Sequence, residues 1–446
     1  MRPPGCEAFI VRVVCGDWCY LAADDKGVNA GFSGKSAIRL LLALLCGAVG
    51  IFLRLGHIEL PPLEAMFVYG GSVLSAAFIL AWAAEALQVD ISQGLAMAVL
   101  AFIAVLPEYA VDLYFAGTAA RDPTYAQYAA ANMTGSNRLL IGIGWALVAL
   151  CSVYHARASQ RASGAATPDA ADTAVRLAPG FGVDLTVLAV ATLWSLLMPL
   201  TRGIAVWNGA GLLVLFAFYL WRVSGAAESE PELAGVAHEL GSLPKVRRRL
   251  AVGFLLVVAA GTLLACAKPF AESLIGSGQQ LGLDQFLLVQ WLAPLASEAP
   301  ELLVATLFAV RGHGAAGMSA LLSSKVNQWT LLVGTLPLVY SAAVGEVASL
   351  PLVPRQVEEL VLTAAQSLLG VAFLLNGRLG MGKAILLLAL FLIQLPFPQT
   401  NVRYGLSLIY VGLALVQFVR HRRLLLPHLR QALGKEPADA SAAPSP

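Results

Sequence analysis

Apolar runs long enough to cross a lipid bilayer recur about twelve times along this chain, and they constrain its fold more than any other feature. A helix needs roughly 20 mostly apolar residues to span the hydrocarbon core. Strands of a membrane barrel would alternate polar and apolar residues, and these runs do not. The expected spans are 37–56, 62–84, 91–117, 125–154, 181–200, 203–223, 250–275, 284–310, 315–342, 359–375, 381–397 and 404–419.

The composition agrees with lipid as the main solvent of the chain. Of the 446 residues, 58% are hydrophobic and 13% are charged, too few charges to cover the surface of soluble domains of this size. The net charge of +2 argues against nucleic acid as a partner, because phosphate binding needs many clustered cations. We therefore expect an all-α polytopic membrane protein whose surroundings are the lipid bilayer.

The distribution of Lys and Arg between loops predicts the orientation. Every second loop carries most of the cations, as do the tail before residue 37 and the tail that begins at Arg420. Cytoplasmic loops retain such cations and translocated loops lose them, so both termini are expected in the cytoplasm. The first 36 residues contain three Asp and do not resemble a cleavable signal peptide. A bacterial inner membrane suits these features.

Polar stretches divide the chain into two membrane halves. A stretch rich in charge separates the two groups of spans, and the end of the chain is rich in Ala, Pro and Ser, which is typical of disorder. The expected divisions are an N-terminal tail 1–36, a first half 37–222 with repeat 1 at about 91–154, a linker 223–248, a second half 249–420 with repeat 2 at about 284–342, and a disordered tail 421–446.

An internal repeat relates the two halves. The pattern Pro-Glu-x-x-Val-x-x-x-Phe-Ala begins at Pro107 and again at Pro300. The following span of each half carries an asparagine, Asn137 or Asn327, seven residues before a glycine. The loop charges orient the two Pro-Glu helices in opposite directions, so the repeats are inverted. Inverted repeats place substrate sites at their interface near the bilayer midplane.

The glutamate of each Pro-Glu pair is the main candidate for chemistry. Glu108 and Glu301 lie deep in apolar runs, where a carboxylate is costly unless it is paired, protonated or bound to a cation. The preceding proline leaves the carbonyl of Ile103 or Ala296 without its helical donor, and a free carbonyl beside a carboxylate suits a cation. The alternative is a kinked helix with a protonated or salt-bridged glutamate.

Further oxygen-bearing side chains lie at helical spacing from these glutamates. Each of them alone would more often form an interhelical hydrogen bond than bind an ion. The candidate ion ligands are Asp112, Ser136 and Asn137 in the first half, and Ser297, Glu298 and Asn327 in the second.

Two cations lie among these candidates. Arg138 follows Asn137 directly, and Lys325 precedes Asn327 by two residues. A cation inside a membrane span needs a partner. Arg138 and Lys325 are expected either to neutralise Asp112 or Glu298 or to take the place of a transported ion.

The two motif regions resemble the α-repeats of the calcium/cation antiporter superfamily, in its bacterial branch related to sodium/calcium exchangers. Those repeats carry Pro-Glu in one helix and Gly-Ser-Asn in the next, as do Leu106-Pro107-Glu108 and Gly135-Ser136-Asn137 here, and the second half has a weaker match at Ser297 to Glu301 and Asn327. The resemblance implies an inverted-repeat cation exchanger fold of about ten core helices between Pro62 and Phe397, with one or two extra helices. It implies Glu108 and Glu301 as the metal ligands, helped by Asn137, Asn327 and Ser297.

The function implied is secondary active cation antiport of the sodium/calcium type, by alternating access and without enzymatic activity or a cofactor. Inorganic cations (calcium, sodium or protons) would be the only ligands. Lys325 stands where the second motif of the family has Gly, and Leu140 and Thr330 stand where it has a further Asn. These departures favour, as an alternative, a proton- or sodium-coupled exchanger of monovalent cations. An intramembrane enzyme and a non-transporting scaffold are less favoured alternatives.

Overall fold

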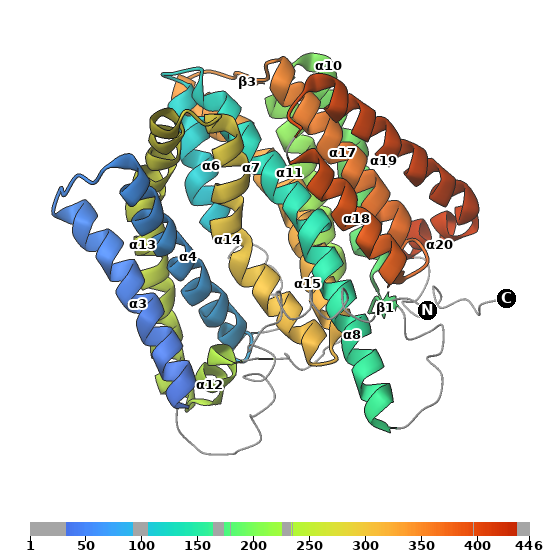
Figure 1. Cartoon of the computed structure of the whole chain (residues 1–446), viewed down its shortest axis with the longest axis horizontal. Helices are drawn as coiled ribbons and strands as arrows, with labels where there is room; N and C mark the ends of the chain where they lie inside the picture. The colour runs from blue at the N-terminus through green and yellow to red at the C-terminus, as the bar shows by residue number, and fades with distance from the viewer. Residues whose placement is uncertain are drawn as a thin grey trace.

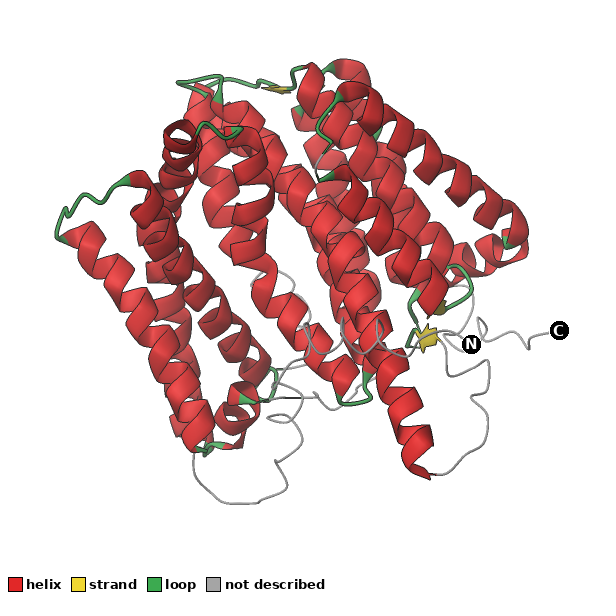
Figure 2. Cartoon of the chain, in the orientation of Figure 1, coloured by secondary structure: helices red, strands yellow, loops and turns green. Residues whose placement is uncertain are grey.

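The computed structural model describes residues 33–91, 106–163, 174–178, 180–224, 233, 235–395 and 397–434. Helices make up nearly all of this part of the chain, as Figure 2 shows. The expectations for the N-terminal tail up to residue 32, for the carbonyl of Ile103 and for the end of the chain after residue 434 lie outside the described residues.

In its described residues the first half contains the expected helices. Its elements are α3 (Gly34–Leu55), α4 (Pro62–Leu87), α6 (Leu106–Ala119), α7 (Tyr125–Leu139), the π-helix η1 (Leu140–Trp145), α8 (Ala146–Ser163), β1 (Ala174–Arg176), α9 (Gly182–Ser195), α10 (Leu197–Thr201), β2 (Gly203–Ile204) and α11 (Val206–Ser224).

The second half follows the same plan. Its elements are α12 (Val236–Ser242), α13 (Lys245–Leu281), α14 (Gln285–Val310), α15 (Gly314–Asn327), the π-helix η3 (Gln328–Leu332), α16 (Val333–Val344), β3 (Leu350–Pro351), α17 (Pro354–Leu374), β4 (Arg378–Gly380), α18 (Met381–Gln394), α19 (Thr400–Arg420) and α20 (Arg422–Ala432).

The structure is that of an all-α polytopic membrane protein. Within the described residues, nine helices are long and apolar enough to cross a membrane. The three other expected spans are also helical where the structure describes them, in α6, in the α15–η3–α16 segment and in α18. Helix α18 has 14 residues, which at 1.5 Å per residue reach only about two thirds of the roughly 30 Å of hydrocarbon.

The structure contains helices in two segments that were expected to be irregular. Part of the tail 421–446, expected to be disordered, forms the amphipathic helix α20, whose His428 and Gln431 are buried. Its C-terminal carbonyls at Gln431 and Ala432 accept hydrogen bonds from Arg222 of α11, a tertiary contact that the local composition does not encode. The predicted linker 223–248 contains α12 and the first turn of α13, because the polar start of α13 continues a helix that is apolar further on.

Helices α3, α4 and α13 form a layer at one side of the bundle (Figure 1), and α12 lies at its lower end. The end of α4 is joined to the start of α13 by Asp90, whose carboxylate accepts hydrogen bonds from Arg248 Nε at 2.7 Å and from Nη2 at 3.0 Å. Arg249 adds a contact of 3.1 Å. These arginines hold the pKa of Asp90 at about 2.

The two Pro-Glu helices run in opposite directions through the centre of the molecule (Figure 1). The hydroxyl of Tyr128, near the start of α7, donates to Gln285 at the start of α14, so α14 begins at the end of the bundle where α6 finishes. Two short antiparallel ribbons, β1 with β4 and β2 with β3, also join the first half to the second. The inverted arrangement agrees with the loop charges.

Helix α7 packs directly on the backbone of α14. A Cβ added at Gly135 would collide with the carbonyl oxygen of Gln290. Pro294, four residues later in α14, has no N–H to donate to that carbonyl. Gly135 of the first repeat therefore packs against a turn of α14 in which Pro294 leaves the carbonyl of Gln290 without its helical donor.

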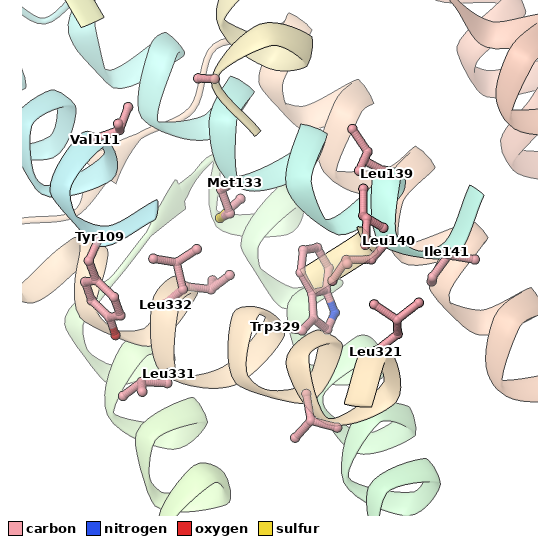
Figure 3. Packing of buried hydrophobic residues seen from close by; sticks show 14 of the residues in the cluster. Tyr109, Val111, Met133, Leu139, Leu140, Ile141, Leu321, Trp329, Leu331 and Leu332 are labelled. Carbon is pink, nitrogen blue, oxygen red and sulfur yellow. The ribbon is translucent and has the colours of Figure 1, made fainter. Parts of the chain in front are cut away.

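Each repeat changes to a π-helix soon after its motif asparagine, at η1 and at η3. Side chains from these segments, including Leu140 and Trp329, are fully buried with Met133 of α7 in the core shown in Figure 3. Short π segments within α-helices are frequent at functional sites.

Candidate functional site

The carboxylate of Glu108 lies in the interior of the bundle. The residue is 1% exposed, and neither carboxylate oxygen makes a hydrogen bond of good geometry. The groups that face it are Glu298 of α14, Ser136 of α7, Gln328 of η3 and the ammonium of Lys325. A buried carboxylate with so few protein donors needs a cation or a proton.

Glu298 and Glu301, one turn apart on α14, are neighbours of Glu108. Glu298 interacts with both other carboxylates and accepts a hydrogen bond from the amide of Gln328. Glu301 is half-buried and accepts a hydrogen bond of 2.5 Å from Ser324. Three carboxylates from the two inverted helices therefore meet in one region, and their mutual repulsion favours binding of positive charge there.

Asp112 extends this acidic region by one turn of α6. It is fully buried, and its Oδ1 accepts a hydrogen bond of 2.9 Å from Asn132 of α7. The two serines predicted as ligands bond to their own helices. Ser136 donates to the carbonyl of Asn132 at 3.0 Å, and Ser297 donates to the carbonyl of Ala293 at 3.2 Å, which leaves a lone pair of each hydroxyl oxygen for a cation.

Lys325 donates hydrogen bonds to both oxygen atoms of Asn137. Its Nζ donates to the side-chain Oδ1 at 2.7 Å and to the backbone carbonyl at 3.1 Å, and it lies 4.6 Å from the ring centre of Trp329. Lys325 also faces Glu108 and Glu298. Of the two motif asparagines, Asn137 thus binds a protein cation, and Asn327 is buried at the end of α15.

Arg138 does not neutralise Asp112 or Glu298, so that part of the prediction is wrong. It points away from the site, to an ion pair of 2.6 Å with Glu359 of α17, and Glu359 pairs in turn with Arg403 of α19 at 2.8 Å. Arg403 also pairs with Glu358 at 3.0 Å. This buried network of two arginines and two glutamates is electrically balanced and joins α7 to α17 and α19.

Several residues of the region could not be identified from sequence patterns. Ser324 and Gln328 contact Glu301 and Glu298, but hydroxyl and amide residues next to Lys325 carry no distinctive spacing. Glu359 is a carboxylate inside an expected membrane span. Such a residue needs a partner, so the sequence did contain a sign that Glu359 matters. Ser323, which has the helical spacing from Asn327 expected of a ligand, bonds instead to Tyr219 of α11.

The carboxylates lie side by side without converging on one point. Within the described part of the chain, no group of three or more His, Cys, Asp or Glu side chains has the arrangement of a metal site. Gln328 and Ser324 hold Glu298 and Glu301. A bound cation would therefore take hydroxyl, amide and carbonyl oxygens together with Glu108 and Glu301, as oxygen-loving cations commonly do.

The sequence profile described as sodium/calcium exchanger protein matches residues 63–225 and 251–398, more than half of the chain. A comparison with curated protein sequences found no match.

Solved structures provide two informative matches. A crystal structure described as that of the H⁺/Ca²⁺ exchanger CAX has a TM-score of 0.83 and 39% sequence identity, over 90% of this chain and 98% of that one. The structure of native YfkE has a TM-score of 0.56 at 14% identity, over 82% of this chain and 99% of that one. The second match concerns the fold alone.

Proposed function

Because this chain belongs to the sodium/calcium exchanger protein family, we propose that it is a secondary antiporter that exchanges Ca²⁺ for protons across a membrane, with Glu108 and Glu301 as the central ligands. The observation that carries the proposal is the meeting of these glutamates, from oppositely directed helices, in one buried region with Glu298 between them. Inverted repeats place such regions at their interface.

The chemistry of the region suits exchange between a divalent cation and protons. Closely spaced buried carboxylates repel one another when ionised and attract Ca²⁺ strongly, because they are hard oxygen ligands. Protons neutralise the same oxygens, so Ca²⁺ and protons compete for them. Movement of the half-bundles relative to each other would then expose the region to one side at a time, with either occupant bound.

The choice of protons as the coupling ion rests on similarity. The structure described as that of an H⁺/Ca²⁺ exchanger shares 39% identity with this chain over 90% of its length. We therefore propose proton coupling in place of the sodium coupling expected from the motifs. We also propose the cell membrane as the location, with both termini in the cytoplasm, on the basis of the loop charges.

Reconstitution in liposomes tests this function. The purified protein is placed in liposomes with an internal Ca²⁺ indicator, and Ca²⁺ uptake is measured with an acidic interior or with internal Na⁺. We expect uptake with the proton gradient and none with the Na⁺ gradient. Glu108→Gln and Glu301→Gln should each lower uptake at least about thirtyfold, because removal of one buried charged partner costs roughly 2–5 kcal/mol.

Glu346→Gln is the matched control, because Glu346 is exposed in the loop after α16. It should transport like the wild type. Full uptake by Glu301→Gln would refute a shared two-glutamate site, and uptake driven by Na⁺ alone would refute proton coupling while leaving Ca²⁺ antiport intact.

A further inference from the structure

Lys325 is in an unusual position for a lysine in a membrane helix. It is 0% exposed, and it belongs to the second repeat while its two hydrogen-bond acceptors belong to Asn137 of the first, 188 positions away. The position two residues before the motif asparagine holds Gly135 in the first repeat. The second repeat therefore introduces a long cation at the position where the first has no side chain.

The surroundings of the Lys325 nitrogen are those of a cation site. Oδ1 and the backbone oxygen of Asn137 lie 2.7 Å and 3.1 Å from Nζ, Trp329 presents its ring at 4.6 Å, and Glu108 and Glu298 supply negative charge. The Lys ammonium is a compact point charge, and like a monovalent metal ion it is attracted to oxygen atoms that carry negative charge.

The backbone carbonyl that Lys325 contacts lies close to a change of helix type. Asn137 lies just before η1, where the helix passes from α to π. The carbonyls of Asn137 and Arg138 both accept side-chain donors from the second half, from Lys325 at 3.1 Å and from Gln366 at 3.1 Å. Backbone carbonyls near carboxylates coordinate Na⁺ where membrane helices are irregular.

We propose that Lys325 is a tethered cation that fills an oxygen-lined position for a monovalent ion at Asn137 and thereby prevents Na⁺ from binding there. A tethered group has a very high effective concentration at its own site, so free Na⁺ competes poorly with it. This inference rests on the proposed antiport for its role, because the filled position adjoins Glu108. Lys325 is then a residue that determines which ion can couple to Ca²⁺ transport.

Thermal unfolding of the purified protein in detergent tests the inference without any transport measurement. A ligand that binds the folded protein raises its Tm. In buffers where NaCl replaces N-methylglucamine chloride, we expect no change for the wild type and a rise of about 2 °C or more for Lys325→Met, whose side chain keeps the length but lacks the charge. Lys325→Gly, which matches the first repeat at Gly135, should respond in the same direction.

Lys268→Met is the matched control, since Lys268 is half-exposed and pairs with Glu272 on its own helix. It should be as insensitive to Na⁺ as the wild type. A Na⁺-dependent rise in the wild type equal to that of either Lys325 variant would overturn the inference, and so would the absence of a rise in folded Lys325→Met or Lys325→Gly.

A second measurement uses the wild type alone, in case neither variant folds. Proton-driven Ca²⁺ uptake should be unchanged when Na⁺ replaces N-methylglucamine on both sides of the liposome membrane, and inhibition by Na⁺ would contradict an Asn137 position closed to it. If the wild type shows no Ca²⁺ uptake at all, the proposed antiport fails, whereas the Tm comparison still decides whether Lys325 excludes Na⁺.

Discussion

The two repeats are built on one plan and differ where their polar residues meet. Both place a glutamate after a proline, an asparagine in the next helix and a π-helix after it. In the first repeat the glutamate, Glu108, has no hydrogen bond of good geometry, whereas Glu301 is held by Ser324. The two glutamates occupy equivalent positions in the repeats, but their neighbouring side chains give them different hydrogen bonds.

Some of these differences fall at matching positions of the two repeats. The residue after the motif asparagine is Arg138 in the first repeat and Gln328 in the second. Arg138 turns away to Glu359, whereas Gln328 turns inward to Glu298. The second carboxylate of each repeat also differs, since Asp112 follows Glu108 by one turn and Glu298 precedes Glu301 by one turn. Symmetry of the backbone thus supports an asymmetric set of ion contacts.

The largest expected effect concerns the first of these matching positions. Arg138→Met leaves Glu359 with one arginine fewer in a buried network, and breaking a buried pair costs about 3–5 kcal/mol. We expect a large fall in Tm, and a smaller fall for Gln328→Met. The double variant Arg138→Met with Glu359→Gln removes both charges and should recover part of the loss. Equal Tm values for Arg138→Met and the wild type would show that the ion pair between Arg138 and Glu359 does not stabilise the fold.

The second prediction compares the additional carboxylates through proton-driven Ca²⁺ uptake in liposomes. Glu298 lies between Glu108 and Glu301, whereas Asp112 is bonded to Asn132. We expect Glu298→Gln to lower uptake by about a hundredfold, near 3 kcal/mol, and Asp112→Asn by less than tenfold. Both variants should be checked for an unchanged Tm. A greater loss in Asp112→Asn than in Glu298→Gln would contradict this expected order of the two carboxylates.

The third prediction concerns the glycine that matches Lys325 in position. Gly135→Ala places a Cβ against the carbonyl of Gln290 and forces α7 away from α14. Overpacking of this kind costs about 1–3 kcal/mol, which should appear as a lower Tm. Gly261 of α13 has open space around it, and Gly261→Ala should leave the Tm unchanged or slightly higher. Equal behaviour of the two variants would mean that the helices separate easily.

The smallest effect concerns the contact between α4 and α13, the helices that precede the repeats. Arg248 holds the pKa of Asp90 at about 2, below the ordinary value of 3.8. The stability from this contact is therefore fully present above about pH 4 and is lost as the pH falls from there toward 2. Asp90→Asn should lower the Tm slightly at pH 7, and the difference from the wild type should shrink below pH 4. A constant difference down to pH 3 would contradict the assignment.

The comparison of the repeats also separates what sequence patterns can predict from what they cannot. Helical spans, the repeat and the two Pro-Glu glutamates follow from local features, because apolar length and a buried carboxylate are visible in the chain itself. The partners of Arg138 were not predictable, since Glu359 and Gln394 lie far along the chain. The helix α20 was missed because a short polar segment becomes a stable helix only when it packs on α9 and α11.

The sequence by itself determined that this is a membrane protein of two inverted halves with a glutamate in each, because the bilayer demands long apolar helices and penalises every unpaired charge within them. The tertiary structure alone decided which charge meets which oxygen. Lys325 reaches Asn137 and Arg138 reaches Glu359 because helices from the two halves lie against each other at those levels. Spacing within one helix sets the face on which a side chain lies, and only the packing of helices sets the group that it contacts.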